Sequence, residues 1–193
     1  MLARILRYCK SKIKRYVIKL SGPEMIYGYT CGGVFLKDTR IGSTTTITQE
    51  TNLYIEDNVF VGHYNFIEAS NGIKIEEGCQ ITNFISIISH SSHNSIRYYG
   101  DKYREYREPV GYVKGEVVIG KYTFVGPHST ILPNTKIGKG CLITSYSLLK
   151  GEYPDFSIIA GNPAKVIGNT NDKDLTVLEE YPDLMQYYKK WAE

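Results

Sequence analysis

The chain has 193 residues, 42% of them apolar, and a formal net charge of +3. This size and composition predict one globular domain and exclude a low-complexity or disordered chain. The sequence shows neither a run of about eighteen apolar residues nor a signal-peptide pattern, so we expect no membrane span and a cytoplasmic location. The four cysteines are widely spaced, as is typical of proteins in a reducing compartment.

Residues 1–20 differ from the rest of the chain in charge. They contain seven basic and no acidic side chains, so this segment carries +7 and the remainder −4. Apolar residues recur there at steps of three and four, which predicts a basic amphipathic helix. Such a helix could cap one end of the domain or make peripheral contact with an anionic membrane, and the two roles are compatible. Because the remainder is acidic, we expect no nucleic-acid partner.

A six-residue period dominates the chain from Ile41 onward. It is clearest from residue 119, where these aliphatic residues fall six apart: Ile119, Val125, Ile131, Ile137, Ile143 and Leu149. A period of six fits neither a helix nor a simple alternating strand. If each hexad is a short strand followed by a bend, three hexads form a triangular coil, and each aliphatic side chain points to its axis. Stacked coils would then bury an aliphatic ladder.

Hexads that begin with an aliphatic residue and glycine resemble those of the hexapeptide-repeat acyltransferases, over about residues 41–168. The segment FSIIAGNPAKVIG at 156–168 is similar to the terminal coil of sugar and antibiotic O-acetyltransferases, including the maltose and nodulation-factor enzymes. This resemblance implies an all-β fold, a left-handed parallel β-helix over residues 21–168. It also implies a homotrimer that transfers an acetyl group from acetyl-CoA to a sugar hydroxyl, without a metal, in surface polysaccharide biosynthesis.

The period fails between Ile87 and about Val117, which predicts a loop extruded from the β-helix at residues 93–116. Its tyrosines could stack on sugar rings, and its arginines could bind hydroxyl or acidic groups of an acceptor. The substrate-binding candidates are Arg97, Tyr98, Tyr99 and Arg104. The alternative is that the loop makes contacts between subunits of the trimer.

Acetyl transfer to a hydroxyl needs a general base, for which histidine is suited. The resembling family places its catalytic imidazole at the position that here holds Ser92, so His93 and His90 are both candidates and His93 is preferred for its proximity. Glu68 follows the inward Ile67 and should point outward, where it could polarise a histidine. His63 and His128 fall at bends and are expected to be structural.

The resemblance also implies which residues bind the donor. Small residues of the late coils would line the pantetheine arm, an aromatic residue replaces a tryptophan of the family, and two lysines would meet the CoA phosphates. The cofactor-binding candidates are Phe124, Gly126, Ser145, Lys150, Ala160 and Lys165.

Residues 169–193 depart from the hexads and predict two short amphipathic helices, broken at Pro182, that form a C-terminal helical cap. Asp172 or Asp174 could supply the acidic residue of a first turn. Three other functions remain open. An amino-sugar N-acetyltransferase would share the repeat, an enzyme resembling the gamma-class carbonic anhydrases would need three histidines around a metal, and a trimeric scaffold would have no catalysis.

Overall fold

The computed structural model describes Val17 and residues 22–193. The basic helix predicted for residues 1–20 therefore lies outside the described residues, apart from Val17. None of the described helices combines the length and the apolar character needed to cross a membrane.

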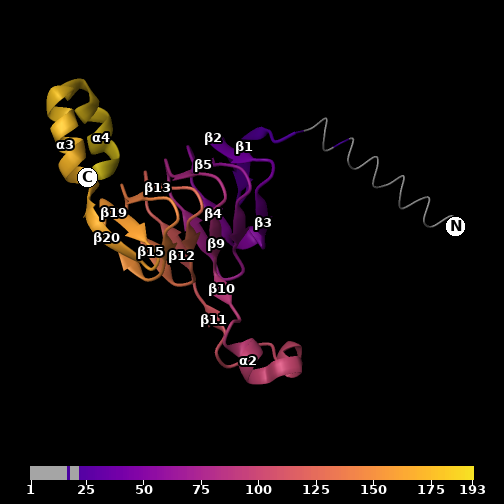
Figure 1. Cartoon of the computed structure of the whole chain (residues 1–193). Coiled ribbons are helices and arrows are strands. Elements are labelled where there is room, and N and C mark those ends of the chain that lie inside the picture. The colour runs from indigo at the N-terminus through magenta and orange to yellow at the C-terminus, as the bar shows by residue number, and fades with distance from the viewer. Residues whose placement is uncertain (1–16, 18–21) are drawn as a thin grey trace.

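The described chain winds into coils whose strands form the three faces of a prism (Figure 1). Face A contains, in spatial order, β1 (Met25–Cys31), β2 (Val34–Gly42), β5 (Phe60–Val61), β8 (Gln80–Ile81), β13 (Phe124–Val125), β16 (Leu142–Ile143), β19 (Ser157–Gly161) and β20 (Ala164–Asn169). Face B contains β3 (Thr46–Thr48), β6 (Phe66–Glu68), β9 (Ser86–Ile88), β14 (Thr130–Ile131) and β17 (Leu148–Leu149). Face C contains β4 (Leu53–Ile55), β7 (Ile73–Ile75), β12 (Val117–Ile119), β15 (Thr135–Ile137) and β18 (Glu152–Tyr153).

The interior of the prism is the aliphatic ladder that the hexads predict. The hexad residues from Ile119 to Ile143 are at most 2% exposed. They stack in register, so that Val125 of β13 lies between Ile81 and Ile143 of the neighbouring parallel strands. Each coil thus covers the apolar surface of the next, and the predicted β-helix core is confirmed.

Each corner of the prism turns within a few residues because one residue adopts a left-handed backbone conformation. At the A–B corner, between faces A and B, these residues are Tyr64, Phe84, His128 and Tyr146, each with φ near +60°. Their rings stack along the edge at centroid distances of 5.1, 4.9 and 4.8 Å. At the C–A corner, Gly78 has φ of +71°, and the Tyr122 ring of the next coil covers the space that a Cβ would fill.

Both ends of the β-helix are antiparallel hairpins, which the prediction of a β-helix over 21–168 did not include. At the first end β1 pairs with β2, and Tyr29 and Cys31 pack against the core. At the other end β20 folds back on β19, so residues 156–168 form a hairpin on the last coil rather than a complete coil.

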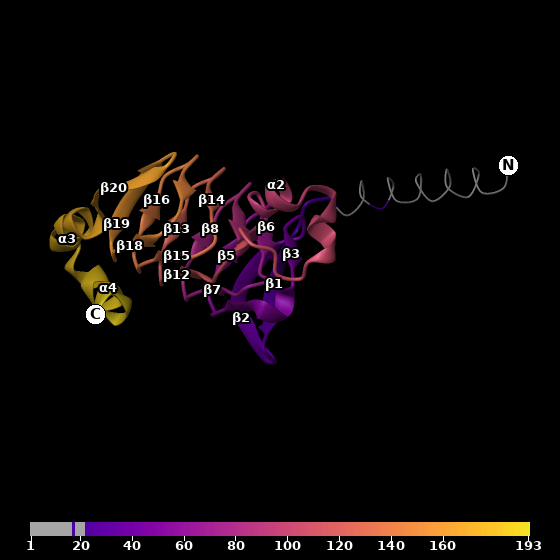
Figure 2. The ribbon, with the colours of Figure 1, turned by 90° about the horizontal axis from the view of Figure 1, so that it is seen from below.

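The extruded loop leaves the prism at the B–C corner through a two-stranded neck, in which β10 (His90–Ser91) pairs antiparallel with β11 (Val113–Lys114). It contains the helix α2 (Ser95–Tyr99) and the 3-10 helix η2 (Gly100–Glu105), so it is more ordered than the predicted loop. The loop projects from the body in Figure 1 and leans toward the N-terminal coils in Figure 2. Beyond it the coil resumes in register, with Val117 between Ile73 and Thr135.

The C-terminal segment forms α3 (Thr170–Glu180), the 3-10 helix η3 (Pro182–Leu184) and α4 (Met185–Ala192), so Pro182 begins the short element between the two α-helices. The side chain of Asn169 accepts a hydrogen bond from the Asn171 N–H at the start of α3, and Asp172 lies in its first turn. Trp191 of α4 packs on Tyr122 at 4.7 Å between ring centroids, which fastens α4 to the C–A corner.

Candidate active site

A buried carboxylate and a histidine meet at the B–C corner, under the neck of the loop. Nδ1 of His90 lies 2.6 Å from Oε2 of Glu68. Strands β6 and β9 stack in register, with Glu68 opposite Ile88, so a residue just beyond Ile88 lies over the corner that follows Glu68. Stacking of successive coils therefore brings together two residues that are 22 positions apart.

Glu68 is 7% exposed, so this carboxylate on the outward side of β6 is buried rather than a surface group. It ends β6 at the corner, where β10 covers it. Burial alone would raise the pKa of this carboxyl, but hydrogen bonds from Ser70, His90 and Ser89 outweigh it and lower the pKa below its ordinary value. Glu68 is therefore ionised near neutral pH.

The ionised carboxylate determines which imidazole nitrogen of His90 carries the proton. A carboxylate only accepts hydrogen bonds, so Nδ1 of His90 must be the donor to Glu68. Nε2 then carries the lone pair of the neutral ring. The side chain of His90 remains 34% exposed, so it is accessible from solvent. Such a histidine can accept a proton from a substrate hydroxyl.

Three further residues hold this pair. The Ser70 hydroxyl lies 3.0 Å from Nδ1 of His90, and the Ser89 hydroxyl donates to Oε2 of Glu68 at 3.0 Å. The ring of Tyr112, from the returning strand of the loop, stacks on His90 at 5.4 Å between centroids and 21° between planes. Sequence reasoning missed these three residues. The coil repeat carried a signal for Ser70, which lies 20 positions before His90, as Ile67 does before Ile87.

His93, the preferred base of the sequence analysis, lies on the other side of the neck. Its Nδ1 is 2.8 Å from the Ser91 hydroxyl, and no carboxylate contact of the kind that His90 makes is seen for it among the described residues. It lines a pocket of about 300 Å³ with Lys150 from the second coil beyond the loop. The other lining residues are Ser91, Asn94, Val113, Leu132 and Pro133. We refer to it as the Lys150 pocket.

The four predicted substrate-binding residues of the loop have different surroundings. Arg97 donates to the His93 carbonyl and to Oδ1 of Asn94. The Tyr98 ring covers Gly111, and the Tyr99 hydroxyl accepts a hydrogen bond from the Val110 N–H, so both tyrosines hold the loop's own fold. Arg104 is exposed.

The predicted donor residues do not gather around His90 and His93 within one chain. Phe124 points outward from face A, Gly126 and Ser145 lie at the A–B corner, and only Lys150 lies at the B–C corner. A Cβ atom at Gly126 would lie 2.6 Å from the backbone nitrogen of Ser145, so the two coils pack closely at this corner. Ala160 and Lys165 pair with each other across the final hairpin.

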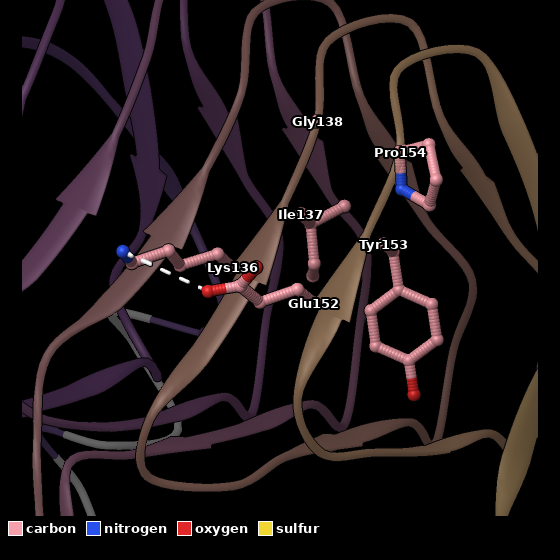
Figure 3. A pocket seen from close by; sticks show the side chains of 6 residues that line it. All are labelled: Lys136, Ile137, Gly138, Glu152, Tyr153 and Pro154. Atoms are coloured by element: carbon pink, nitrogen blue, oxygen red, sulfur yellow. Dashed lines mark ion pairs between the residues drawn. The ribbon is translucent and has the colours of Figure 1, made fainter.

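The remaining histidines have structural contacts, as expected. Nδ1 of His63 lies 3.1 Å from the Thr44 hydroxyl, and His128 is stacked between Phe84 and Tyr146. Among the described residues, no group of three or more His, Cys, Asp and Glu side chains is arranged to hold a metal ion. A second hollow, on face C, is lined by Lys136, Ile137, Gly138, Glu152, Tyr153 and Pro154 (Figure 3). Its two charged groups, Lys136 and Glu152, pair with each other at 3.9 Å.

Comparison with known proteins identifies the repeat. Residues 116–151 match the family model of the bacterial transferase hexapeptide (six repeats). A Mycobacterium tuberculosis protein named as an acetyltransferase is 30% identical over 67% of this chain and 41% of its own length. WbbJ of Escherichia coli K12, named as a lipopolysaccharide biosynthesis O-acetyl transferase, is 31% identical over 62% of this chain and 61% of its own length. The chain thus spans less than two thirds of these relatives.

Among solved structures, AntD, an N-acyltransferase from Bacillus cereus in complex with dTDP and 3-hydroxybutyryl-CoA, has a TM-score of 0.54 and 20% identity. The match covers 78% of this chain and 89% of AntD. This likeness concerns the fold. Together, the repeat match and the stacked coils show that the chain contains the hexapeptide repeat of bacterial transferases, which implies a left-handed β-helix.

Proposed function

We propose that this protein is an acetyl-CoA-dependent O-acetyltransferase that acetylates a sugar hydroxyl in the biosynthesis of a surface polysaccharide, in the cytoplasm. The observation that carries the proposal is the 2.6 Å contact between Nδ1 of His90 and the buried, ionised Glu68. It leaves Nε2 of a partly exposed imidazole free to accept a proton at the base of an extruded loop. The relatives named as acetyltransferases support the same reaction class.

In this proposal His90, rather than His93, is the general base. Nε2 of His90 accepts the proton of the sugar hydroxyl while its oxygen attacks the acetyl carbonyl carbon, and Glu68 stabilises the imidazolium that forms. Acetyl-CoA supplies the activated acetyl group as a thioester. A carbon–oxygen bond forms, the carbon–sulfur bond breaks, and His90 returns its proton to the departing thiolate. No acyl-enzyme is needed.

The Lys150 pocket suits the donor. Val113, Leu132 and Pro133 give it apolar walls, and Lys150 adds a positive charge, which together match an apolar arm that ends in phosphates. It lies on the side of the neck that faces the C-terminal coils. The side that faces the N-terminal coils, toward which the loop leans, is then left for the acceptor.

We also propose a homotrimer, supported by how charge is distributed over the prism. The outward strand positions from β5 to β19 of face A include Phe60, Gln80, Phe124, Leu142 and Ile158. Those from β6 to β17 of face B are Phe66, Ser86, Thr130 and Leu148, with Glu68 and Ile88 at the B–C end of their strands. Face C instead presents three charged residues, Lys74, Lys136 and Glu152, beside the uncharged Tyr54 and Val118. Apart from Glu68 at the B–C corner, these positions of faces A and B are uncharged and meet at the exposed ring stack of the A–B corner, which suits burial against further copies.

This assembly would also complete the donor site. The sequence-predicted donor residues of face A would approach the Lys150 pocket of a neighbouring copy, which a single chain does not allow. The three sites of a closed ring would then be equivalent.

The test is incubation of the purified protein with acetyl-CoA and candidate nucleotide sugars or surface polysaccharides, read by mass spectrometry. We expect a mass shift of one acetyl group that mild alkali removes, as it does from an ester. An alkali-stable product would instead establish amino-sugar N-acetylation, in line with the N-acyltransferase class of AntD. Absence of any acyl-CoA binding would favour a non-catalytic scaffold.

A further inference from the structure

A second pocket lies at the same corner as His90, nearer to the N-terminal end. Its volume is about 390 Å³, and we call it the Glu50 pocket. It is lined by Tyr29, Cys31, Gly32, Glu50, Thr51, Asn52, Leu53 and Tyr54. The 3-10 helix η1 (Glu50–Asn52) supplies its centre and joins β3 to β4, so the pocket occupies the B–C corner two coils before His90.

Hydrogen bonds connect the two places across adjacent coils. The Ser70 hydroxyl contacts Nδ1 of His90, and the Ser70 carbonyl accepts a hydrogen bond from the Asn52 side chain at 3.2 Å. Neighbouring strands are about 4.8 Å apart, so the Glu50 pocket lies roughly 10 Å from His90 along the prism axis. The loop also leans from His90 toward the N-terminal coils, where this pocket lies (Figure 2).

The side chains of the pocket define the chemistry of its ligand. The Tyr29 hydroxyl donates to Oε1 of Glu50 at 2.6 Å, which fixes the carboxylate and leaves its other oxygen to accept hydrogen bonds. Tyr54 is 53% exposed and offers an aromatic surface. A carboxylate beside aromatic rings suits the hydroxyl groups and apolar face of a pyranose, whereas the negative charge of Glu50 opposes phosphates and acidic sugars.

We propose that the Glu50 pocket binds an uncharged sugar unit of the acceptor, so that the acceptor is an oligosaccharide lying along the B–C corner with its reactive hydroxyl at His90. This inference rests on the proposed acetylation of a sugar hydroxyl. A pyranose ring is about as long as one coil spacing and the pocket lies two coils from His90, so the pocket receives the second unit beyond the one that is acetylated.

The experiment measures binding of neutral saccharides in the absence of acetyl-CoA. The probes are maltotriose, cellotriose, chitotriose and mannotriose, each compared with its monosaccharide by calorimetry. The second readout is the rate of Cys31 alkylation by iodoacetamide, followed by peptide mass spectrometry. Cys79 and Cys141 serve as internal controls, because burial raises their pKa to about 12 and about 11 and keeps them unreactive.

We expect at least one trisaccharide to bind tenfold or more tightly than its monosaccharide and to slow Cys31 alkylation. Glu50→Gln and Tyr54→Ala should remove that advantage, while Tyr187→Ala, at a similarly exposed tyrosine of α4, should keep it. The inference is wrong if no trisaccharide of the panel binds better than its monosaccharide, if the advantage survives Tyr54→Ala, or if Cys31 reacts at an unchanged rate.

The two proposals fail separately in this design. Trisaccharide binding that protects Cys31, without acetyl transfer to any acceptor, would contradict the proposed function and leave the Glu50 pocket standing. Acetyl transfer to monosaccharides without a trisaccharide advantage would contradict only the Glu50 pocket.

Discussion

His90 and Glu68 stand on adjacent coils with Nδ1 and Oε2 2.6 Å apart, and the carboxylate also accepts a hydrogen bond from the Ser89 hydroxyl. This arrangement fixes both the orientation and the protonated nitrogen of the imidazole. The first prediction follows from it. His90→Ala should lower kcat by about 10²–10⁴-fold with little change in the Kd for acetyl-CoA, because it removes the proton acceptor and leaves the Lys150 pocket intact.

The matched control is His93→Ala, which should cost less turnover because the hydrogen bond of its ring among the described residues is to the Ser91 hydroxyl and not to a carboxylate. Steady-state kinetics on the true acceptor checks both. If His93→Ala abolishes turnover while His90→Ala leaves it unchanged, the base assignment is wrong. If a variant that carries both His90→Ala and His93→Ala keeps full activity, the mechanism with a histidine as general base must be abandoned.

The second prediction concerns stability against pH. The native fold lowers the pKa of Glu68, so this group stabilises the fold at pH values above its unfolded pKa of about 4.3 and loses that contribution as pH falls through the lower native pKa. Glu68→Gln should therefore cost about 1–3 kcal/mol of unfolding free energy at pH 7. The difference should begin to shrink below about pH 4, where Glu68 becomes protonated in the unfolded chain, and should be lost only once the pH falls below the lower native pKa. Urea denaturation at pH 7 and pH 3.5 measures this; a difference that stays constant between the two would contradict it.

The third prediction concerns the donor. Lys150→Ala should raise the Kd for acetyl-CoA about tenfold, or ~1.4 kcal/mol, by removing the cation of the Lys150 pocket. Lys165→Ala should weaken binding as well if the sequence resemblance places this lysine correctly. Lys136→Ala, on face C, is the control and should bind normally. Calorimetry measures the Kd for acetyl-CoA of each variant. An unchanged Kd for Lys150→Ala would show that the Lys150 pocket does not bind the donor.

The fourth prediction concerns assembly. Tyr146→Asp places a charge on the exposed end of the ring stack, where burial against other copies would make it unfavourable. We expect sedimentation velocity to show a trimer for the wild type and smaller species for this variant. Tyr187→Asp in α4 should remain trimeric. A wild-type monomer at micromolar concentration would overturn the proposed assembly.

The fifth prediction tests the ladder. Ile119→Ala removes a fully buried side chain and should cost about 2–5 kcal/mol of unfolding free energy, because neighbouring coils close the resulting cavity only in part. Val118→Ala, the adjacent residue on the outer side of β12, should change stability by less than about 0.5 kcal/mol. Equal losses would mean that the inside and outside of the coil are assigned wrongly.

The coils could be predicted from the sequence because the buried, inward-facing position recurs every six residues. Val125 and Ile143 each occupy the inward position of their hexads, and every coil repeats the pattern. The hairpins at both ends were not predicted, since residues 25–39 and 162–168 carry no such repeat. The choice between His90 and His93 could not be made from local sequence. It depends on what the previous coil places under each residue, and only His90 lies over Glu68 and Ser70.

The neck of the loop allows the loop sequence to vary without altering the coils of the prism. The Gly115 N–H donates to the Ser89 carbonyl at 3.0 Å, so the coil closes across the base of the loop as it would without any insertion. Residues 92–112 are therefore a cassette, bounded by a ribbon that leaves the ladder of neighbouring coils unbroken. Grafting that cassette between relatives would exchange the group presented to the acceptor, while the proton acceptor His90, in the neck beneath the cassette, is inherited unchanged.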